Sequence, residues 1–164
     1  MIKRTNVSED GVESEAVFSH CENYRYSLMR TWDSLKKRVV FIGLNPSTAT
    51  ELKNDPTVAR IMVFARDWGY GSATVLNLFA FRATLPSDMK KVDNPVGKEN
   101  DYFIKRGIKG ADKIVVCWGN HGLFLGRGLE VREMIGAAEC FGLTKVGEPK
   151  HPLYLRRDAE LLSC

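Results

Sequence analysis

Three mainly apolar runs without regular alternation set the strongest limits on what this chain can fold into. A strand with one face in water alternates apolar and polar residues, whereas an unbroken apolar run of this length indicates a strand covered on both faces. Segments with apolar residues at helical spacing lie between the runs, and strands alternating with helices predict a parallel sheet with helices on both faces. The runs are Arg38 to Leu44, Ser72 to Phe79 and Lys113 to Trp118.

The helices between these runs have recognisable start and stop signals. An Asp or Asn followed by Pro is a typical helix start, and Gly is a typical helix end. A further helix is predicted after the third run, around Leu129, Met134 and Ile135. The first two helices are predicted from Asp55-Pro56 to Gly69 and from Asn94-Pro95 to Gly110.

The N-terminal part of the chain has a different pattern. Two short alternating runs, Ala16 to Ser19 and Tyr24 to Arg30, flank a turn-like segment and predict a β-hairpin. Tyr24, Tyr26 and Leu28 would form its buried face, with Arg25 and Arg30 pointing away. The first 14 or so residues are predicted to be a loose arm. The whole chain, 1–164, is then one domain: a three-layer α/β/α fold with a central, mainly parallel sheet of about four strands, plus an N-terminal hairpin.

Length and composition narrow the class of protein. No apolar run reaches the length of a membrane span, and the polar N-terminus lacks a hydrophobic signal core, so a cytoplasmic protein that does not contact a membrane is expected. The four cysteines form no C-x-x-C pair, which favours reduced thiols over a metal site, and no cofactor is expected. The net charge of +4 is compatible with a phosphate-bearing partner without requiring one. The oligomeric state is left open.

Amide and imidazole side chains stand at or near the ends of the three predicted strands. In open parallel sheets ligands bind beyond the carboxyl ends of the strands, so these residues are candidates for a binding site. Asn45, before Pro46, is either a turn former or a functional amide. Asn77, inside an apolar strand, can donate and accept at once and so could read the amide-like edge of a nucleobase. Asn120 and His121 follow the third strand.

A histidine near the C-terminus is a further candidate. His151 lies in a short loop braced by Pro149 and Pro152. It could be a passive surface residue, but a rigid loop is suited to presenting a side chain to a ligand, and the second role is favoured here.

Four segments in order resemble the uracil-DNA glycosylase superfamily. "FIGLNPS" is similar to its first motif, where an Asn or Asp positions the attacking water, and "ATVLNLFAFRAT" to the strand whose asparagine reads the flipped base. "IVVCWGNHG" looks like a later core strand, and "KHPLYL" resembles the closing His-Pro motif. The resemblance implies a uracil-DNA glycosylase-like fold.

A narrower resemblance covers nearly the whole chain. "YRYSLMRTW", "LNPSTA", "DPTVAR", "WGYG", "NLFAFRAT", "NPVGKEND" and "GLTKVGEPKHPLYL" resemble a family of small bacterial and phage proteins of unknown function, which brings no activity with it. The chain also departs from the glycosylases. "HPLYL" lacks the serine that follows His-Pro there, and no DNA-penetrating leucine loop is evident.

The resemblance implies a candidate enzyme that hydrolyses an N-glycosidic bond in DNA, a nucleotide or a nucleoside. Asn45 would orient water, and His151 would stabilise negative charge on the departing base. Asn77 would read the base, with Phe79 or Phe81 stacked on it. If a general base is needed, Asp55 is the nearest acid, although its role as a helix cap is favoured. The full set of candidate ligand-binding residues is Gly43, Pro46, Ser47, Asn77, Phe79, Arg82, Asn120 and His121.

Two alternatives stay open. The first is a binding or accessory protein that holds a nucleotide or nucleic acid without chemistry. Its phosphate contacts would come from Arg25, Arg30, Arg82, Lys150, Arg156 and Arg157. The second is a hydrolase with Cys117 as nucleophile, for which only His121 stands near in sequence as a base.

Overall fold

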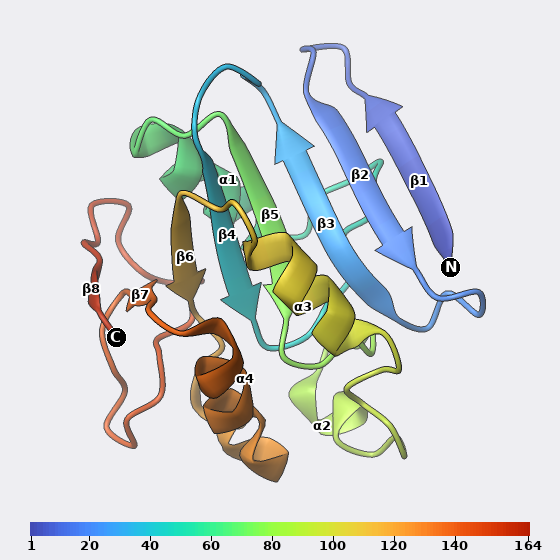
Figure 1. Ribbon diagram of the computed structural model, residues 1–164, viewed down its shortest axis with the longest axis vertical. Helices are drawn as coiled ribbons and strands as arrows, with labels where there is room; N and C mark the ends of the chain where they lie inside the picture. The colour runs from blue at the N-terminus through green and yellow to red at the C-terminus, as the bar shows by residue number, and fades with distance from the viewer.

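Strand β4 (Arg38–Gly43) lies among the inner strands of an eight-stranded sheet in the computed structural model, which describes residues 1–164. The strands are ordered β1-β2-β3-β5-β4-β6-β7-β8 (Figure 1). β4 pairs in parallel with β5 (Ser72–Asn77) on one side and with β6 (Lys113–Val116) on the other. The three apolar runs therefore form three neighbouring strands, each shorter at its C-terminal end than its run.

The predicted fold class is wrong, because the sheet is neither four-stranded nor mainly parallel. Four strand pairings are antiparallel (β1 with β2, β2 with β3, β3 with β5, β7 with β8) and three are parallel. The prediction failed because the hairpin β2–β3 joins the sheet directly: β3 (Arg25–Thr31) pairs along β5 from Leu28 opposite Val75 to Thr31 opposite Ser72. A uracil-DNA glycosylase-like sandwich is thus not what the chain forms.

The N-terminal residues also belong to the sheet. β1 (Ile2–Val7) pairs with the whole of β2 (Glu13–Phe18), so the segment predicted to be a loose arm is an edge strand with its turn. At the other edge stand two very short strands, β7 (Glu139–Cys140) and β8 (Leu162–Ser163).

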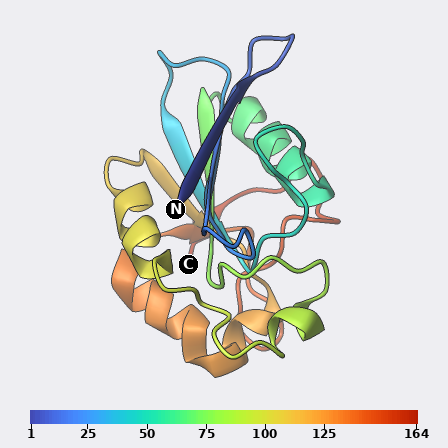
Figure 2. The same ribbon diagram turned by 90° about the vertical axis from the view of Figure 1, so that its right-hand side faces the viewer.

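Helices cover the inner strands on both faces (Figure 2). Alternate residues of β4 divide between the two sides: Val39 and Phe41 pack with α1 (Pro56–Asp67), whereas Val40 and Ile42 pack with α3 (Asn100–Ile108) and α4 (Arg127–Ile135). This double burial explains the unbroken apolar sequence of the strand. The remaining helical segments are α2 (Pro86–Met89) and the 3₁₀ helix η1 (Asn120–Gly126).

The start of α1 is confirmed, but that of α3 is wrong. The Asp55 side chain accepts from the backbone N–H of Val58 at 2.8 Å, with Pro56 in the first turn. Asn94 instead caps a turn, accepting from Gly97 N–H at 3.1 Å, and α3 begins only at Asn100. None of the helices has the length and the apolar surface that crossing a bilayer would require.

Candidate functional site

Two adjoining cavities lie at the carboxyl ends of β4, β5 and β6. The inner cavity, of about 50 Å³, reaches Arg25, Asn77 and Cys117. The outer cleft, of about 620 Å³, opens past Trp118, Asn120, His121 and Tyr154. The two cavities share one wall, which separates the inner cavity from the outer cleft. The residues that line both cavities are Leu44, Asn45, Ser47, Asp55, Thr57 and His151.

Buried arginines from β3 hold the loop between β4 and α1, which carries most of this wall. Arg25 is only 2% exposed and donates to Ala49 O at 3.1 Å. Arg30, 4% exposed, donates to Asn54 Oδ1 at 3.1 Å and to Lys53 O at 3.0 Å. The prediction that Arg25 and Arg30 point away from the protein core is therefore wrong.

A β-bulge accounts for Arg25. The pairing of β2 with β3 shifts register between Val17 and Phe18, so Arg25 lies opposite Phe18 while Ser27 lies opposite Val17. Tyr26 stacks on Phe103 of α3, with ring centroids 5.3 Å apart, whereas Arg25 lies on the α1 side. A bulge re-aims side chains in this way and is common beside functional sites.

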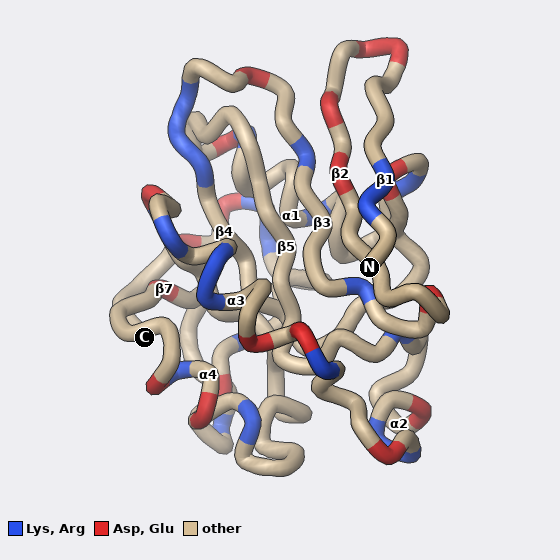
Figure 3. The backbone as a smooth tube through the Cα atoms, turned by 45° about the vertical axis from the view of Figure 1, so that its right-hand side comes forward, with Lys and Arg blue, Asp and Glu red and all other residues tan.

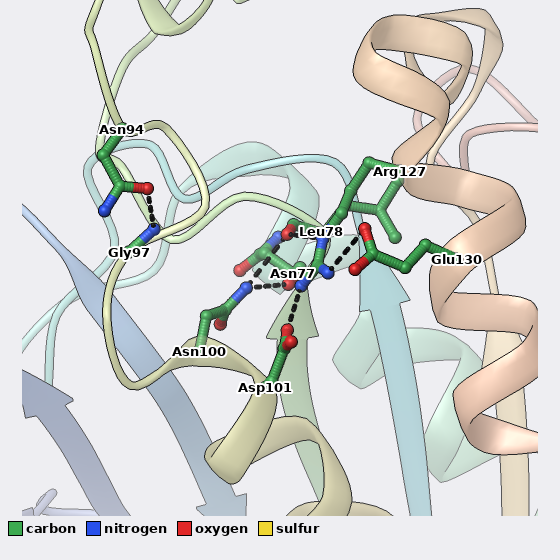
Figure 4. Close-up of polar contacts among 8 residues, drawn as sticks. All are labelled: Asn77, Leu78, Asn94, Gly97, Asn100, Asp101, Arg127 and Glu130. Atoms are coloured by element: carbon green, nitrogen blue, oxygen red, sulfur yellow. Dashed lines mark hydrogen bonds and ion pairs between the residues drawn. The ribbon is translucent and has the colours of Figure 1, made fainter.

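The position of Asn77 is fixed from behind by two helices (Figure 4). Asn100 of α3 donates to the backbone carbonyls of Asn77 and Leu78, both at 2.9 Å. Arg127 of α4, 2% exposed, donates to Leu78 O at 2.9 Å and pairs with Asp101 at 2.5 Å. The Asn77 side chain accepts from Arg25 at 3.4 Å, and its Nδ2 has no protein acceptor. That donor is free for a molecule in the inner cavity.

Asn45 is half tied to the protein and half free. Its Nδ2 donates to Ala83 O at 2.9 Å and to Pro46 O at 3.1 Å, which fixes the amide plane. Its Oδ1 accepts no hydrogen bond from the protein. The turn-forming and the functional interpretation are thus compatible, because the two ends of one amide can serve different purposes.

His151 is held as a neutral donor. The backbone N–H of Leu153 donates to Nδ1 at 3.1 Å, so the proton of the neutral ring sits on Nε2. Burial lowers the pKa of His151, and the nearby Asp55 carboxylate only partly opposes this. The residue therefore presents an N–H donor in the wall shared by the two cavities.

Arg25 and Asp55 form the charged part of the inner cavity. Burial lowers the pKa of Arg25 to about 10, and the charge of Asp55 opposes that change. Arg25 Nε is buried and has no hydrogen-bond partner in the protein. A buried N–H without a partner is costly, and the inner cavity lined by Arg25, Asn45 and Asn77 has room for a water or a polar ligand atom.

The other predicted site residues divide into three groups: those that line the inner cavity, those at the outer cleft, and those that line neither. Gly43, Pro46 and Ser47 line the inner cavity, and Asn120 and His121 lie on the exposed rim of the outer cleft.

Phe79 and Arg82 line neither cavity. Phe79 is buried against Phe124, with ring centroids 5.6 Å apart. Arg82 donates to Glu22 O at 3.0 Å and lies 4.9 Å over the ring of Phe18.

Cysteine and metal chemistry receive no support from the geometry. Cys117 lines the inner cavity, but burial raises the pKa of its thiol to about 12, so it is not a thiolate nucleophile near neutral pH. No group of three or more His, Cys, Asp or Glu side chains is placed to hold a metal ion.

Comparison with models of protein families gives one match for this chain. Residues 25–153 match the family described as "Protein of unknown function (DUF1643)". The chain belongs to this family. No curated protein and no solved structure matches it. The matched segment begins at the buried Arg25 and takes in every residue around the two cavities except Tyr154, whereas β1, β2 and β8 lie outside it.

Proposed function

We propose that this protein binds the base of a nucleotide or nucleic acid in the outer cleft and hydrolyses its N-glycosidic bond. The observation that carries the proposal is a ligand-sized cleft that shares one wall with a water-sized polar cavity. The cleft of about 620 Å³ falls within the range of small-molecule sites. The inner cavity of about 50 Å³ is too small for a base but has room for water.

The groups in the shared wall fit the needs of such a reaction. Water must be oriented toward the sugar carbon as the bond to the base breaks, and Asn45 Oδ1 offers a rigid acceptor for that water. Negative charge develops on the departing base, and the Nε2–H of neutral His151 can donate to it. The resemblance of the segments around these two residues to uracil-DNA glycosylase motifs supports the same roles.

A second candidate function, binding without chemistry, is favoured by the state of Asp55. Both carboxylate oxygens already accept backbone N–H groups, from Val58 at 2.8 Å and from Ala49 at 3.4 Å. Both oxygens of this carboxylate are thus already used by the helix cap and the loop, rather than being free to accept a proton from water. The set of arginines predicted to contact phosphate in such a binding protein does not form one surface. Arg25 and Arg30 are buried. Arg156 and Arg157 form ion pairs with Asp158 and Asp67.

Ligand-dependent thermal unfolding tests the binding step. The wild-type protein is heated with a panel of nucleobases, nucleosides, nucleotides and short oligonucleotides, and a ligand that prefers the folded state raises the midpoint. The same panel is then incubated with the protein and analysed chromatographically for free base. No shift with any member would overturn both candidate functions, and a shift without base release would leave the binding function alone.

Asn45→Ala separates the two roles of Asn45. Loss of its hydrogen bonds to the protein should lower the free energy of unfolding by about 1 kcal/mol. Asn94→Ala is the control, because the Asn94 side chain also holds a turn, accepting from Gly97 N–H, and lines neither cavity. We expect Asn45→Ala to abolish base release while Asn94→Ala retains it. Equal activity in both variants would contradict the water-orienting role.

A further inference from the structure

We propose that Lys90 and His121 form a phosphate subsite at the rim of the outer cleft. The inference rests on the proposed function, since the phosphate would belong to the ligand whose base occupies the cleft. Lys90 directly follows α2, and His121 is the second residue of η1 and lines the cleft together with Pro86 and Asn120. The Lys90 ammonium lies 2.9 Å from His121 Nδ1.

The Lys90 ammonium is held in one position by two contacts and is not freely mobile in the solvent. It lies 5.3 Å from the centre of the Phe124 ring, and Phe124 in turn packs on the buried Phe79. Two directional contacts, one to an imidazole and one to an aromatic face, therefore fix a positive charge beside the cleft. A fixed charge loses less entropy on binding an anion than a mobile surface lysine does.

No carboxylate neutralises this pair. Lys90 takes part in no ion pair, whereas the adjacent Lys91 pairs with Asp88 at 3.7 Å. Burial and the charge of Lys90 both lower the pKa of His121, and no acidic group opposes them. The neutral ring accepts from Lys90 at Nδ1 and so carries its proton on Nε2.

The pair thus offers three hydrogen-bond donors to an incoming anion. An ammonium has three N–H groups, of which one is used on His121, and the imidazole adds Nε2–H. Phosphoryl oxygens are matched acceptors for such donors, and charge-assisted bonds of this kind are among the stronger ones. Elsewhere acidic and basic residues are interspersed along much of the chain (Figure 3).

The phosphoryl group has two possible sources, a free mononucleotide or the backbone of a nucleic acid. Affinities at constant ionic strength distinguish them: uridine and adenosine, their 5′-monophosphates, a short oligothymidylate, and inorganic phosphate alone. The charge-assisted bonds should make each monophosphate bind about 10-fold more tightly than its nucleoside. A preference for the oligothymidylate over the monophosphates would assign the phosphate to a nucleic-acid backbone.

Lys90→Met and Lys91→Met are the matched variants. Both lose one positive charge from adjacent positions, but only Lys90 faces His121. We expect Lys90→Met to abolish the advantage of the monophosphates and the binding of inorganic phosphate, and Lys91→Met to retain both. Equal losses in the two variants would reduce the effect to general electrostatics and overturn the subsite.

The subsite and the proposed function can fail separately. Nucleosides that bind as tightly as their monophosphates would overturn the subsite and leave base binding intact. Inorganic phosphate that binds through Lys90, with no nucleoside binding at all, would uphold the subsite and overturn base recognition.

Discussion

At the scale of single residues, the site depends on side chains that serve the fold with one atom and the cavity with another. Asn45 ties its nitrogen to the Ala83 carbonyl and leaves its oxygen free. His151 accepts from Leu153 at one ring nitrogen and presents the other as a donor. In both residues one atom bonds to the protein and keeps the side chain rigid, while the other atom stays available to bind a ligand.

The neutral state of His151 predicts how stability changes with pH. Because burial lowers its pKa in the folded protein, the unfolded chain binds this proton more readily once the pH falls below about 6.5. The free energy of unfolding should therefore fall with decreasing pH through this range, by no more than about 1.4 kcal/mol per pH unit for one histidine. Urea denaturation between pH 7.5 and 5 measures this slope, the range being a rough bracket around the histidine pKa.

His151→Asn should flatten that slope, since the variant has no group to protonate at this position. A slope that is the same in His151→Asn and wild type would show that His151 is not kept neutral by its surroundings.

At the scale of elements, the start of α1 links helix capping to the charge of the site. Asp55 caps the helix through Val58 and also acts on Arg25 and His151. Burial lowers the pKa of both residues, and the negative charge of Asp55 opposes this lowering. The Asp-Pro signal in the sequence was sufficient to predict the cap. The second role was not predictable, because it needs Arg25 from β3, and the bulge that turns Arg25 inward leaves no periodic signal.

Two substitutions of Asp55 separate these roles. Asp55→Asn keeps an oxygen acceptor for Val58 but removes the charge, so α1 should form normally while the pKa of His151 falls further. Asp55→Ala removes both and should lower the free energy of unfolding by a further 0.5–2 kcal/mol or so, the usual range for a lost N-cap. Urea denaturation and the NMR titration of His151 give the two readouts. Equal stability of the two variants would contradict the capping role.

At the scale of the whole molecule, the sequence was informative where burial is greatest and failed at the sheet edges. The runs in β4, β5 and β6 are mainly apolar and show no alternation, so their strand character is local information. β1 reads Ile-Lys-Arg-Thr-Asn-Val, half exposed, and gave no strand signal, while β7 and β8 have only two residues each. Their pairing is decided by tertiary contacts. The antiparallel attachment of β3 to β5 likewise depends on packing between segments more than 40 residues apart.

The same scale explains how distant elements hold the site together. Arg127 of α4 and Asn100 of α3 both bind the carbonyl of Leu78, directly after β5, so two helices on one face of the sheet fix the strand end that carries Asn77. Neither residue stood out in the sequence, because a polar or charged residue in an amphipathic helix is usually exposed. Only the fold reveals that Arg127 is 2% exposed.

Arg127→Met tests this connection. The substitution keeps most of the side-chain volume but removes the donor to Leu78 and the partner of Asp101 and Glu130. Asp101 and Glu130 are 45% and 59% exposed, so water can solvate them, whereas the buried donor is lost outright. Leu78 O keeps its hydrogen bond from Asn100, so the free energy of unfolding should fall by about 1.5–3 kcal/mol, as for the loss of one hydrogen bond from a charged group. Glu130→Gln, which breaks only the exposed pair, should change it by less than about 1 kcal/mol.

Amide hydrogen exchange adds a local readout, since faster exchange of Leu78 and Phe79 N–H groups in Arg127→Met would locate the loss at the end of β5. Exchange rates there equal to those of Glu130→Gln would mean that Arg127 does not hold the strand end that carries Asn77.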